Sequence, residues 1–451
     1  MPAATPPPSL PSSLVVVVDV TPMLPGGGNG GSKWVALSLI EHFLKLRPDW
    51  TWWLLTTTSN EGFLAELFPT ARLFRVLDRQ GRLIEAPQLQ ALPGGASADL
   101  LFCPFTAPFH AILPVPTISI VHDLQFAAYP QFFAKADIAE RARHFSDAVA
   151  ICDRLICVSD YVANEVRRVA RLNHRRVGFV HNAIADRLPA VTPQDATAVL
   201  DRLGLVAGRY LLYPANTWPH KNHAMLITAV GQYFAAHPDS DLKLVCAGVS
   251  DDPRGRALRE AVVRMGLAQR VLFPGFQDEP AFAALLSSAR ALIFPSLFEG
   301  FGIPVLEAMA MGVPVLSADT TSLPEICGEA ALMFDPRRPH DIVRAIEAIE
   351  TDPGLAVRLA AAGRVQARTI GTAETMAARY LAIFAEVCKE RRRLRGQIGW
   401  RTLVMRRRAV RLARWLFGRV QLVRAAAGRR LPAVRALVNR IRGLLSGTSR
   451  S

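Results

Sequence analysis

The chain has 451 residues, more than one ordinary domain holds, and half of them are apolar, which excludes a disordered protein. Its net charge of +15 is uneven, because residues 389–451 hold 18 Arg and one Lys against one Glu and residues 1–388 are left at −3. No apolar run reaches the roughly 18 residues that a membrane-spanning helix needs.

The N-terminal residues 1–13 are rich in proline and have neither a basic segment nor a long apolar stretch. We therefore expect a disordered tail and no signal peptide. The cysteines show no C-x-x-C spacing, and most lie in or beside apolar runs, so we expect reduced core thiols in a cytoplasmic protein. They are Cys103, Cys152, Cys157, Cys246, Cys327 and Cys388.

Short apolar segments alternate with helical patterns along the first half of the chain, which predicts strands joined by helices. The expected strands are 13–20, 99–104, 117–123, 154–159 and 176–182, and the expected helices include 32–46 and 160–170. The polar stretch 184–197 is expected to be a linker.

The same alternation returns in the second half. The expected strands there are 210–216, 242–248, 270–275, 291–296 and 313–319, and the expected helices are 222–236, 280–289 and 303–311. Apolar strands without polar alternation indicate sheets that are covered on both faces, hence an α/β protein with two Rossmann-like, doubly wound domains. Ligands of such domains bind beyond the carboxyl ends of the strands, here in a cleft.

The predicted organisation has five parts. The N-terminal tail is followed by a first domain over 14–190 and a second over 191–370. Residues 371–388 are expected to form a helix that returns to the first domain, and residues 389–451 a basic helical tail.

Two features of the first domain interrupt its apolar pattern. Gly30 and Gly31 end a glycine cluster that opens a helix, where tight turns and an anion at the helix N-terminus are favoured, although a flexible loop remains an alternative. His122 ends an expected strand, where it could bind a hydroxyl group or take a proton. A structural histidine is the alternative there.

The second domain places polar residues after its first strand and an exposed backbone after its third. Asn216, His220 and Lys221 follow the strand 210–216, and a lysine at this position is a compact partner for phosphate. The alternative is a solvated surface lysine. The backbone at Phe276 could support a flat base.

The stretch IFPSLFEGFGIPVLEAM joins a strand to a helix through glycines. The backbone N–H groups of Gly300, Phe301 and Gly302 can face a diphosphate, with the helix dipole behind them. Glu307 lies within the helix, where a buried carboxylate needs ligand hydroxyls or a donor such as Lys221.

Glu299 and Glu307 could instead be the acid and base of a glycosidase. If both were helical, they would lie about 12 Å apart along the axis. Such pairs need roughly 5 to 9.5 Å, so two separate roles are favoured.

The segments 299–307, 312–319 and 322–336 together resemble the family 4 retaining glycosyltransferases, which have two Rossmann-like domains in the GT-B arrangement. The resemblance runs from about residue 14 to about residue 388 and includes I-V-H-D-L and P-A-N-T-W-P-H-K-N-H. The second of these motifs is most similar to bacterial mannosyltransferase-like members that build surface polysaccharide.

This resemblance implies roles for individual residues. Glu307 would bind the ribose hydroxyls of a nucleotide-sugar, and Glu299 would contact the transferred sugar near its reacting centre. The amides around Phe301 and Gly302, together with Lys221, would hold the diphosphate.

Other positions complete the implied site. His122 would contact the donor sugar, the Phe276 backbone would meet the base, and Gly30 and Gly31 would line the cleft. Many family members carry Gly-Arg where this chain has Ala215-Asn216. The usual arginine–phosphate contact is therefore absent, and His220 is a candidate to compensate.

The implied reaction is transfer with retention on the front face of the donor, where the leaving diphosphate helps to accept the proton of the acceptor. Stabilisation of the leaving group by Lys221 and helix N-termini would be its largest catalytic contribution. We expect no metal or other cofactor, because the one D-x-D sequence, at 239–241, precedes an expected strand and so lies at the wrong end of the sheet.

The basic tail has an amphipathic pattern over residues 400–445. One face of its first helix carries Leu412, Leu416, Val420 and Val423, with Arg407, Arg411 and Arg414 opposite. Such helices favour an anionic membrane surface. A partner protein is the second interpretation. RNA is the third, because few aromatics are interleaved, and no nucleic-acid partner is expected.

The resulting hypothesis is a hexosyltransferase, with GDP-mannose as the guessed donor and a lipid-linked surface polysaccharide as the acceptor. It would be cytoplasmic and peripheral on the inner face of the plasma membrane. A sugar-nucleotide epimerase and a sugar phosphorylase remain alternatives, as does a membrane-recruited scaffold without activity.

Overall fold

The computed structural model describes residues 10–25, 29–76, 97–108 and 115–394, with side chains as far as residue 390. Both sheets of the protein lie in one compact unit, residues 1–390. Most of the predicted N-terminal tail and the predicted basic tail from residue 395 onward lie outside the described residues.

The first domain is built on a seven-stranded parallel sheet with the order β3-β2-β1-β4-β5-β6-β7. Its strands are β1 Val15–Asp19, β2 Thr51–Thr56, β3 Arg72–Arg75, β4 Leu100–Cys103, β5 Thr117–Val121, β6 Arg154–Cys157 and β7 Val177–Phe179. Every residue of β4 and β5 is buried. This double-sided burial explains why their sequences lack polar alternation.

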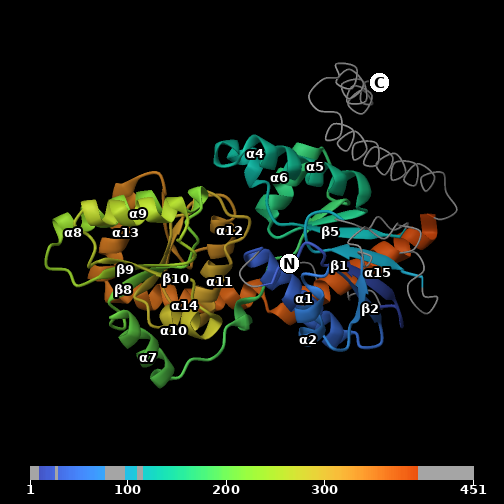
Figure 1. Ribbon diagram of the computed structural model, residues 1–451, viewed down its shortest axis with the longest axis horizontal. Helices are drawn as coiled ribbons and strands as arrows, with labels where there is room; N and C mark the ends of the chain where they lie inside the picture. Colours follow the sequence, from blue (N-terminus) through green and yellow to red (C-terminus); the bar gives the residue numbers. More distant parts are fainter. Residues whose placement is uncertain (1–9, 26–28, 77–96, 109–114, 395–451) are drawn as a thin grey trace, which may run out of the picture. The chain divides into compact units, whose positions relative to one another are not determined.

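Helices cover this first sheet (Figure 1). The described helical elements before residue 190 are α1 Gly31–Leu46, α2 Glu61–Leu67, α4 Gln125–Ala128, η1 Pro130–Phe132, α5 Lys135–Ile151, α6 Asp160–Ala170 and η2 Ala185–Arg187, of which η1 and η2 are 3-10 turns. The hydroxyl of Ser159 accepts a hydrogen bond from the Val162 N–H at 3.2 Å and so caps α6.

The second domain is built on a six-stranded parallel sheet with the order β10-β9-β8-β11-β12-β13. Its strands are β8 Tyr210–Tyr213, β9 Lys243–Ala247, β10 Val271–Gly275, β11 Ala291–Phe294, β12 Val315–Ala318 and β13 Leu332–Phe334. Its helical elements are α7 Pro193–Leu203, η3 Pro219–Lys221, α8 His223–Ala236, α9 Pro253–Arg264, α10 Glu279–Ser287, α11 Ile303–Met311, α12 Leu323–Cys327, α13 Pro339–Thr351 and α14 Pro353–Ile370.

The predicted fold class of two parallel, Rossmann-like sheets is confirmed, but three strands were not predicted. β3 and β13 are short strands at sheet edges, where the neighbouring strand decides the pairing. β2 has the sequence TWWLLT, whose aromatic run is typical of a strand and could have identified it. The segment 184–197, which was expected to be a linker, contains η2 and the start of α7.

Each sheet has a point at which its strand order reverses, and ligands of doubly wound folds bind beyond the carboxyl ends of the strands there. In the second sheet this point lies between β8 and β11. The segment with Asn216 and Lys221 follows β8, and the segment with Glu299 follows β11. The topology therefore brings the two motif-bearing segments to one place.

The last described helix, α15 Ala373–Leu394, packs against the first domain although it follows the second. The rings of Tyr380 and Phe384 lie with their centroids 5.6 and 5.1 Å from the Phe102 ring of β4. Arg154 of β6 donates to Glu390 at 2.6 Å. The chain thus crosses between the domains twice.

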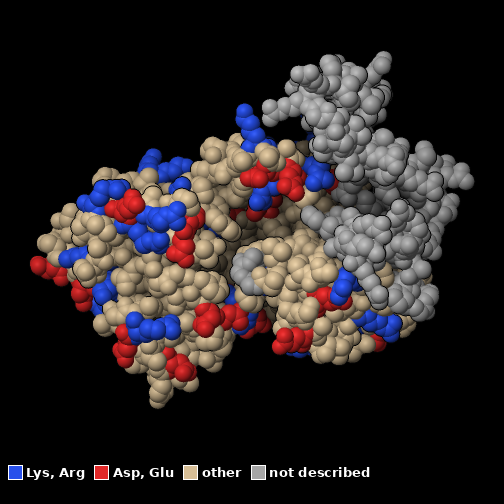
Figure 2. All heavy atoms as spheres, in the orientation of Figure 1, with Lys and Arg blue, Asp and Glu red and all other residues tan. Residues whose placement is uncertain are grey.

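The charged side chains of the described residues are mixed in sign over the face that Figure 2 shows. This mixture agrees with the small net charge of residues 1–388. None of the described helices combines the length and the hydrophobicity that a bilayer-spanning segment requires. All six cysteines are buried, as expected for core thiols.

Candidate functional site

The turn between β11 and α11 is held by hydrogen bonds from the segment before α12. The N–H of Glu299 donates to the Thr321 hydroxyl at 3.1 Å, and the Ser322 hydroxyl donates to the Glu299 carbonyl at 3.0 Å. Gly302 has a φ of 99°, in the left-handed region that favours glycine. Pro304 lies at the start of α11 as predicted, so the turn ends at a helix N-terminus.

Gly300 packs directly against the first domain. A Cβ atom at Gly300 would lie 2.0 Å from the backbone carbonyl oxygen of His122, which only a glycine avoids. The Gly300 carbonyl also accepts a hydrogen bond from the Ser159 hydroxyl at 2.7 Å. The turn that carries Glu299 is therefore positioned by residues of both domains.

Lys221 and Glu299 form an ion pair. The Lys221 Nζ lies 2.6 Å from Oε1 of Glu299, and the two side chains are only 15% and 12% exposed. The Lys221 carbonyl accepts from the Tyr213 hydroxyl at 2.5 Å, which fixes the end of η3. The pair places an ammonium group beside the turn, where an anion bound to the turn amides would meet it.

Glu307 is fully buried in α11 and has a partner that the sequence analysis did not name. Its Oε1 accepts from the Nε of Arg187 at 2.6 Å, whereas Lys221, the donor suggested from the sequence, pairs with Glu299 instead. Its Oε2 is buried without any hydrogen-bond partner. Burial raises the pKa of the Glu307 carboxyl, against the opposing effect of the Arg187 charge.

Arg187 belongs to η2 in the segment that was expected to be a plain linker. Its Nη1 also donates to Glu279 at 2.6 Å, and its guanidinium lies 5.1 Å from the ring centroid of Trp34 in α1. In the sequence Arg187 is an arginine in a polar segment. That pattern does not predict its pairing with Glu307, which lies 120 positions away. Arg187 thus holds one oxygen of Glu307 and leaves the other without a partner.

The glycine loop of the first domain lies against the second domain. Gly30 has a φ of 54°, and a Cβ atom there would lie 3.8 Å from the ring of Trp218. A Cβ atom on Gly31 would approach the Ile303 side chain at the start of α11 to 2.9 Å. Both predicted glycines therefore border the region of the turn.

His122 is a neutral hydrogen-bonding group in this environment. Its Nε2 lies 2.7 Å from the Pro104 carbonyl oxygen, which can only accept, so Nε2 carries the proton. Burial lowers the pKa of His122. Nδ1 is then the nitrogen that can accept a hydrogen bond from a hydroxyl group.

The residues that replace the usual arginine do not supply its charge. The side-chain oxygen of Asn216 accepts from the Val249 N–H at 2.8 Å, which ties Asn216 to the backbone after β9. Burial lowers the pKa of His220 to about 4, so this residue is neutral near pH 7. Without a bound anion His220 therefore adds no positive charge near pH 7, and Lys221 carries the positive charge here.

Phe276, whose backbone is predicted to meet the base, follows β10 and is 63% exposed. It borders a surface hollow together with Arg202 of α7 and Asp278 before α10. The D-x-D sequence at 239–241 precedes β9, and its Asp241 pairs with Arg209. Within the described ranges no group of three or more metal-ligating side chains comes together, and the absence of a metal stays a prediction.

Glu325, which lies in the segment 322–336 of the family resemblance, joins the two domains. Its carboxylate accepts from the N–H groups of Asp160 and Tyr161 at 2.8 and 2.9 Å, in the first turn of α6. His181 Nε2 lies 2.7 Å from its Oε1. Although burial raises the pKa of Glu325, the bonds from His181 and the two amides outweigh it and hold this pKa below its usual value.

Comparison with known proteins finds similar proteins for the second domain. Residues 208–352 match the family model of glycosyl transferases group 1. The O-antigen chain mannosyltransferase B of Escherichia coli is 28% identical over 275 residues, 59% of this chain and 70% of that protein. The serotype-specific mannosyltransferase WbdA of Escherichia coli is also 28% identical over 275 residues, 58% of this chain and 32% of its own length.

A solved structure agrees on the fold. The Anabaena protein Alr3699/HepE, crystallised with UDP and glucose, superposes with a TM-score of 0.64 at 16% identity and covers 83% of this chain and all of its own. The predicted resemblance to glycosyltransferases of GT-B fold is confirmed, and these relatives support the prediction of a hexosyltransferase.

Proposed function

We propose that this chain, which carries a group 1 glycosyl transferase domain in residues 208–352, transfers mannose from GDP-mannose to a growing, lipid-linked polysaccharide with retention of configuration. The names of its relatives support the choice of sugar, since two of them are mannosyltransferases of Escherichia coli, one of them of the O-antigen chain. The base of the donor, the retention of configuration and the lipid-linked acceptor come from the sequence hypothesis alone.

The observation that carries the proposal is the state of Glu307. A buried carboxylate oxygen without a hydrogen bond costs free energy, and a ligand hydroxyl group is a partner that would remove this cost. The second oxygen is already held by Arg187, so Oε2 has a fixed direction. A pair of ribose hydroxyls is the proposed partner, beside a turn whose amides suit a diphosphate.

The reaction then needs little covalent chemistry from the protein. The bond between the anomeric carbon and the leaving diphosphate breaks, and the acceptor oxygen forms its bond to that carbon on the same face. The proton of the acceptor hydroxyl passes to an oxygen of the leaving diphosphate. Lys221 and the amides of the turn stabilise the charge that develops on this group. Glu299, released from Lys221, contacts the sugar.

The site of action is part of the same proposal. The basic pattern of residues 400–445 supports contact with an anionic membrane, which would bring the protein to a lipid-linked acceptor on the inner face of the plasma membrane. These residues lie outside the described part of the chain, so this step is supported by the sequence alone.

A donor screen tests the proposal. Purified protein is incubated with GDP-mannose, then with UDP-glucose and other nucleotide-sugars, and with membrane extract from a polysaccharide-deficient strain. NMR of the product gives the anomeric configuration. We expect an α-mannoside only in the presence of extract, which supplies the acceptor. Conversion of the nucleotide-sugar without extract would instead indicate an epimerase, which needs no acceptor.

The variant that tests the role of the site is Glu307→Ala, which we expect to abolish product formation. A β-configured product would contradict retention, and unchanged polysaccharide in cells that carry only Glu307→Ala would favour the scaffold hypothesis. Strong transfer from UDP-glucose without transfer from GDP-mannose would refute the choice of donor and leave the glycosyltransferase assignment in place.

A further inference from the structure

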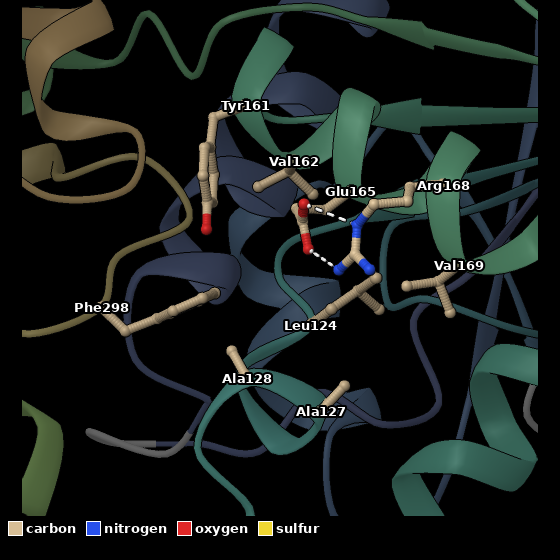
Figure 3. Close-up of a pocket in the computed structure, with 9 residues that line it drawn as sticks. All are labelled: Leu124, Ala127, Ala128, Tyr161, Val162, Glu165, Arg168, Val169 and Phe298. Carbon is tan, nitrogen blue, oxygen red and sulfur yellow. Dashed lines mark hydrogen bonds and ion pairs between the residues drawn. The ribbon is translucent and has the colours of Figure 1, made fainter.

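A cavity separate from the Glu307 region opens between α4 and α6. It has a cavity volume of about 80 Å³ and is partly open to solvent, and Leu124, Ala128 and Val162 contribute to its apolar wall. Figure 3 shows Tyr161 and Phe298 on one side of it and the pair of Glu165 and Arg168 on the other. Apolar walls with a few convergent polar groups are typical of small-ligand sites.

Two residues of the cavity wall are neighbours in sequence of candidate site residues. Leu124 lies two positions after His122, and Phe298 directly precedes Glu299. Gly300, the next residue in the turn, packs on the His122 backbone. The two segments that carry His122 and Glu299 therefore each contribute one residue to the wall of this cavity.

The aromatic side of the cavity is fixed by ring contacts. The Phe298 ring lies with its centroid 6.0 Å from the Tyr129 ring and 6.3 Å from the Tyr161 ring. The Tyr129 hydroxyl donates to the Leu297 carbonyl at 3.3 Å. Burial raises the pKa of Tyr161, so its hydroxyl keeps its proton and can donate a hydrogen bond.

The polar side is a bidentate ion pair on α6. The Nε and Nη2 groups of Arg168 donate to the two carboxylate oxygens of Glu165 at 3.1 and 2.6 Å. Each of these oxygens has a further lone pair, and the remaining N–H groups of Arg168 can donate as well. The pair can therefore accept from and donate to neighbouring hydroxyl groups.

From this arrangement we propose that the cavity binds a sugar ring of the acceptor saccharide, next to the ring that carries the reacting hydroxyl group. A pyranose has an apolar C–H face that packs on an aromatic ring and a hydroxyl edge that bonds to the ion pair. An aliphatic chain would leave Glu165 and Arg168 unused. This inference rests on the proposed function, whose acceptor it describes.

The test compares acceptors of different length with GDP-mannose as the donor. The probes are methyl α-mannoside and an α-linked mannobiose, and the quantity is the ratio of their kcat/KM values. For the native protein we expect the disaccharide to be favoured about 5-fold or more, the effect of one or two hydrogen bonds. Ala128→Phe, which fills the cavity from an exposed position, and Glu165→Gln should bring the ratio toward unity.

The matched control is Asp341→Asn, which breaks another i,i+3 pair with Arg344 on α13. It should keep the native ratio, and thermal unfolding should show that all variants fold. Native ratios in both cavity variants would overturn the proposal. The proposal would also be overturned if Ala128→Phe lowered kcat/KM only for a dodecyl mannoside. An aliphatic chain, and not a sugar ring, would then fill the cavity.

Saturation-transfer NMR with mannotriose separates this inference from the proposed function. If no donor supports transfer, the proposed function fails, but a mannotriose signal that Ala128→Phe abolishes would still support a saccharide site. No signal with the native protein, together with no preference for the longer acceptor, would overturn the inference.

Discussion

At the scale of single residues, the pairing of Arg187 determines what Glu307 can do. A carboxylate with no solvent exposure is retained only with a charged or hydrogen-bonding partner, and Arg187 supplies this partner at 2.6 Å. The second oxygen has no hydrogen-bond partner in the protein. Arg187 also contacts Glu279 and Trp34, so one guanidinium joins α10, α11 and α1.

Arg187→Ala is expected to weaken both stability and donor binding. Removal of one partner from a buried pair costs about 3–5 kcal/mol, because the remaining charge is buried unpaired. We expect the Kd for GDP, measured by calorimetry, to rise about 10-fold or more, since Glu307 loses its orientation.

Arg290→Ala is the matched control for this prediction. Arg290 donates to Glu350 at 2.9 Å in another largely buried pair, but it directly precedes β11 and so lies at the amino end of the sheet. This variant should lose stability and keep its nucleotide affinity. An equal loss of affinity in both variants would mean that Arg187 acts only through stability.

At the scale of elements, the turn between β11 and α11 depends on close backbone contact with the first domain. The approach of Gly300 to the His122 carbonyl leaves no room for a side chain. Ser159, which caps α6, also donates to the Gly300 carbonyl. One helix N-terminus and one strand end of the first domain thus hold the turn of the second.

Gly300→Ala is expected to displace this turn. The added methyl group would lie 2.0 Å from a backbone oxygen, so the turn must move, and a shift of about 1 Å near reacting groups can cost roughly 100-fold in rate. The measurement is kcat/KM for sugar transfer. Gly62→Ala, in α2 with nothing within 4 Å, is the control and should stabilise by about 0.5–1 kcal/mol. Native activity of Gly300→Ala would contradict the close packing of the turn.

The contact of Glu325 with α6 is expected to depend on pH. Its folded pKa lies below the unfolded value, so its stabilisation is fully present above about pH 4.3 and is lost as the pH falls through the folded pKa. Glu325→Gln should therefore lower the free energy of unfolding at pH 7 by about 1 kcal/mol, and by less in acid.

Urea unfolding at several pH values measures this difference, and the amides of Asp160 and Tyr161 should exchange hydrogen faster in the variant. Glu329→Gln, four positions further along and exposed, is the control without an expected effect. If the difference in the free energy of unfolding between Glu325→Gln and the native protein stayed constant down to pH 3, the charge of the Glu325 carboxylate would not contribute to stability.

At the scale of the whole molecule, the charge of the chain is divided between a mildly acidic compact unit and a basic C-terminal segment. The full chain with Arg407, Arg411 and Arg414 changed to Gln is expected to lose binding to phosphatidylserine vesicles. Each arginine near an anionic surface contributes about 1 kcal/mol, so the loss is about 100-fold. Co-sedimentation measures it.

The control for the tail keeps its charge. The same three positions changed to Lys should retain most of the vesicle binding, and neither protein should bind neutral phosphatidylcholine vesicles strongly. Native binding by the Gln variant would refute the membrane interpretation and favour the partner-protein alternative.

The sequence by itself determined the architecture and the location of the candidate site. Uninterrupted apolar strands required sheets with both faces covered, and a strand followed by glycines and an early proline required a turn into a helix N-terminus. The predicted turn at Glu299 to Gly302 and the helix with Glu307 lie where the pattern put them. These features are local, so the order of residues is enough to specify them.

Only the tertiary structure decided which charges meet. Arg187 is 120 positions from Glu307, and Lys221 is 78 positions from Glu299, so no local pattern could assign either pair. The same holds for Glu325 at the N-terminus of α6 and for the cavity beside Phe298. Such contacts arise when strand order and domain packing bring distant segments together, and burial then determines which partner each charge must have.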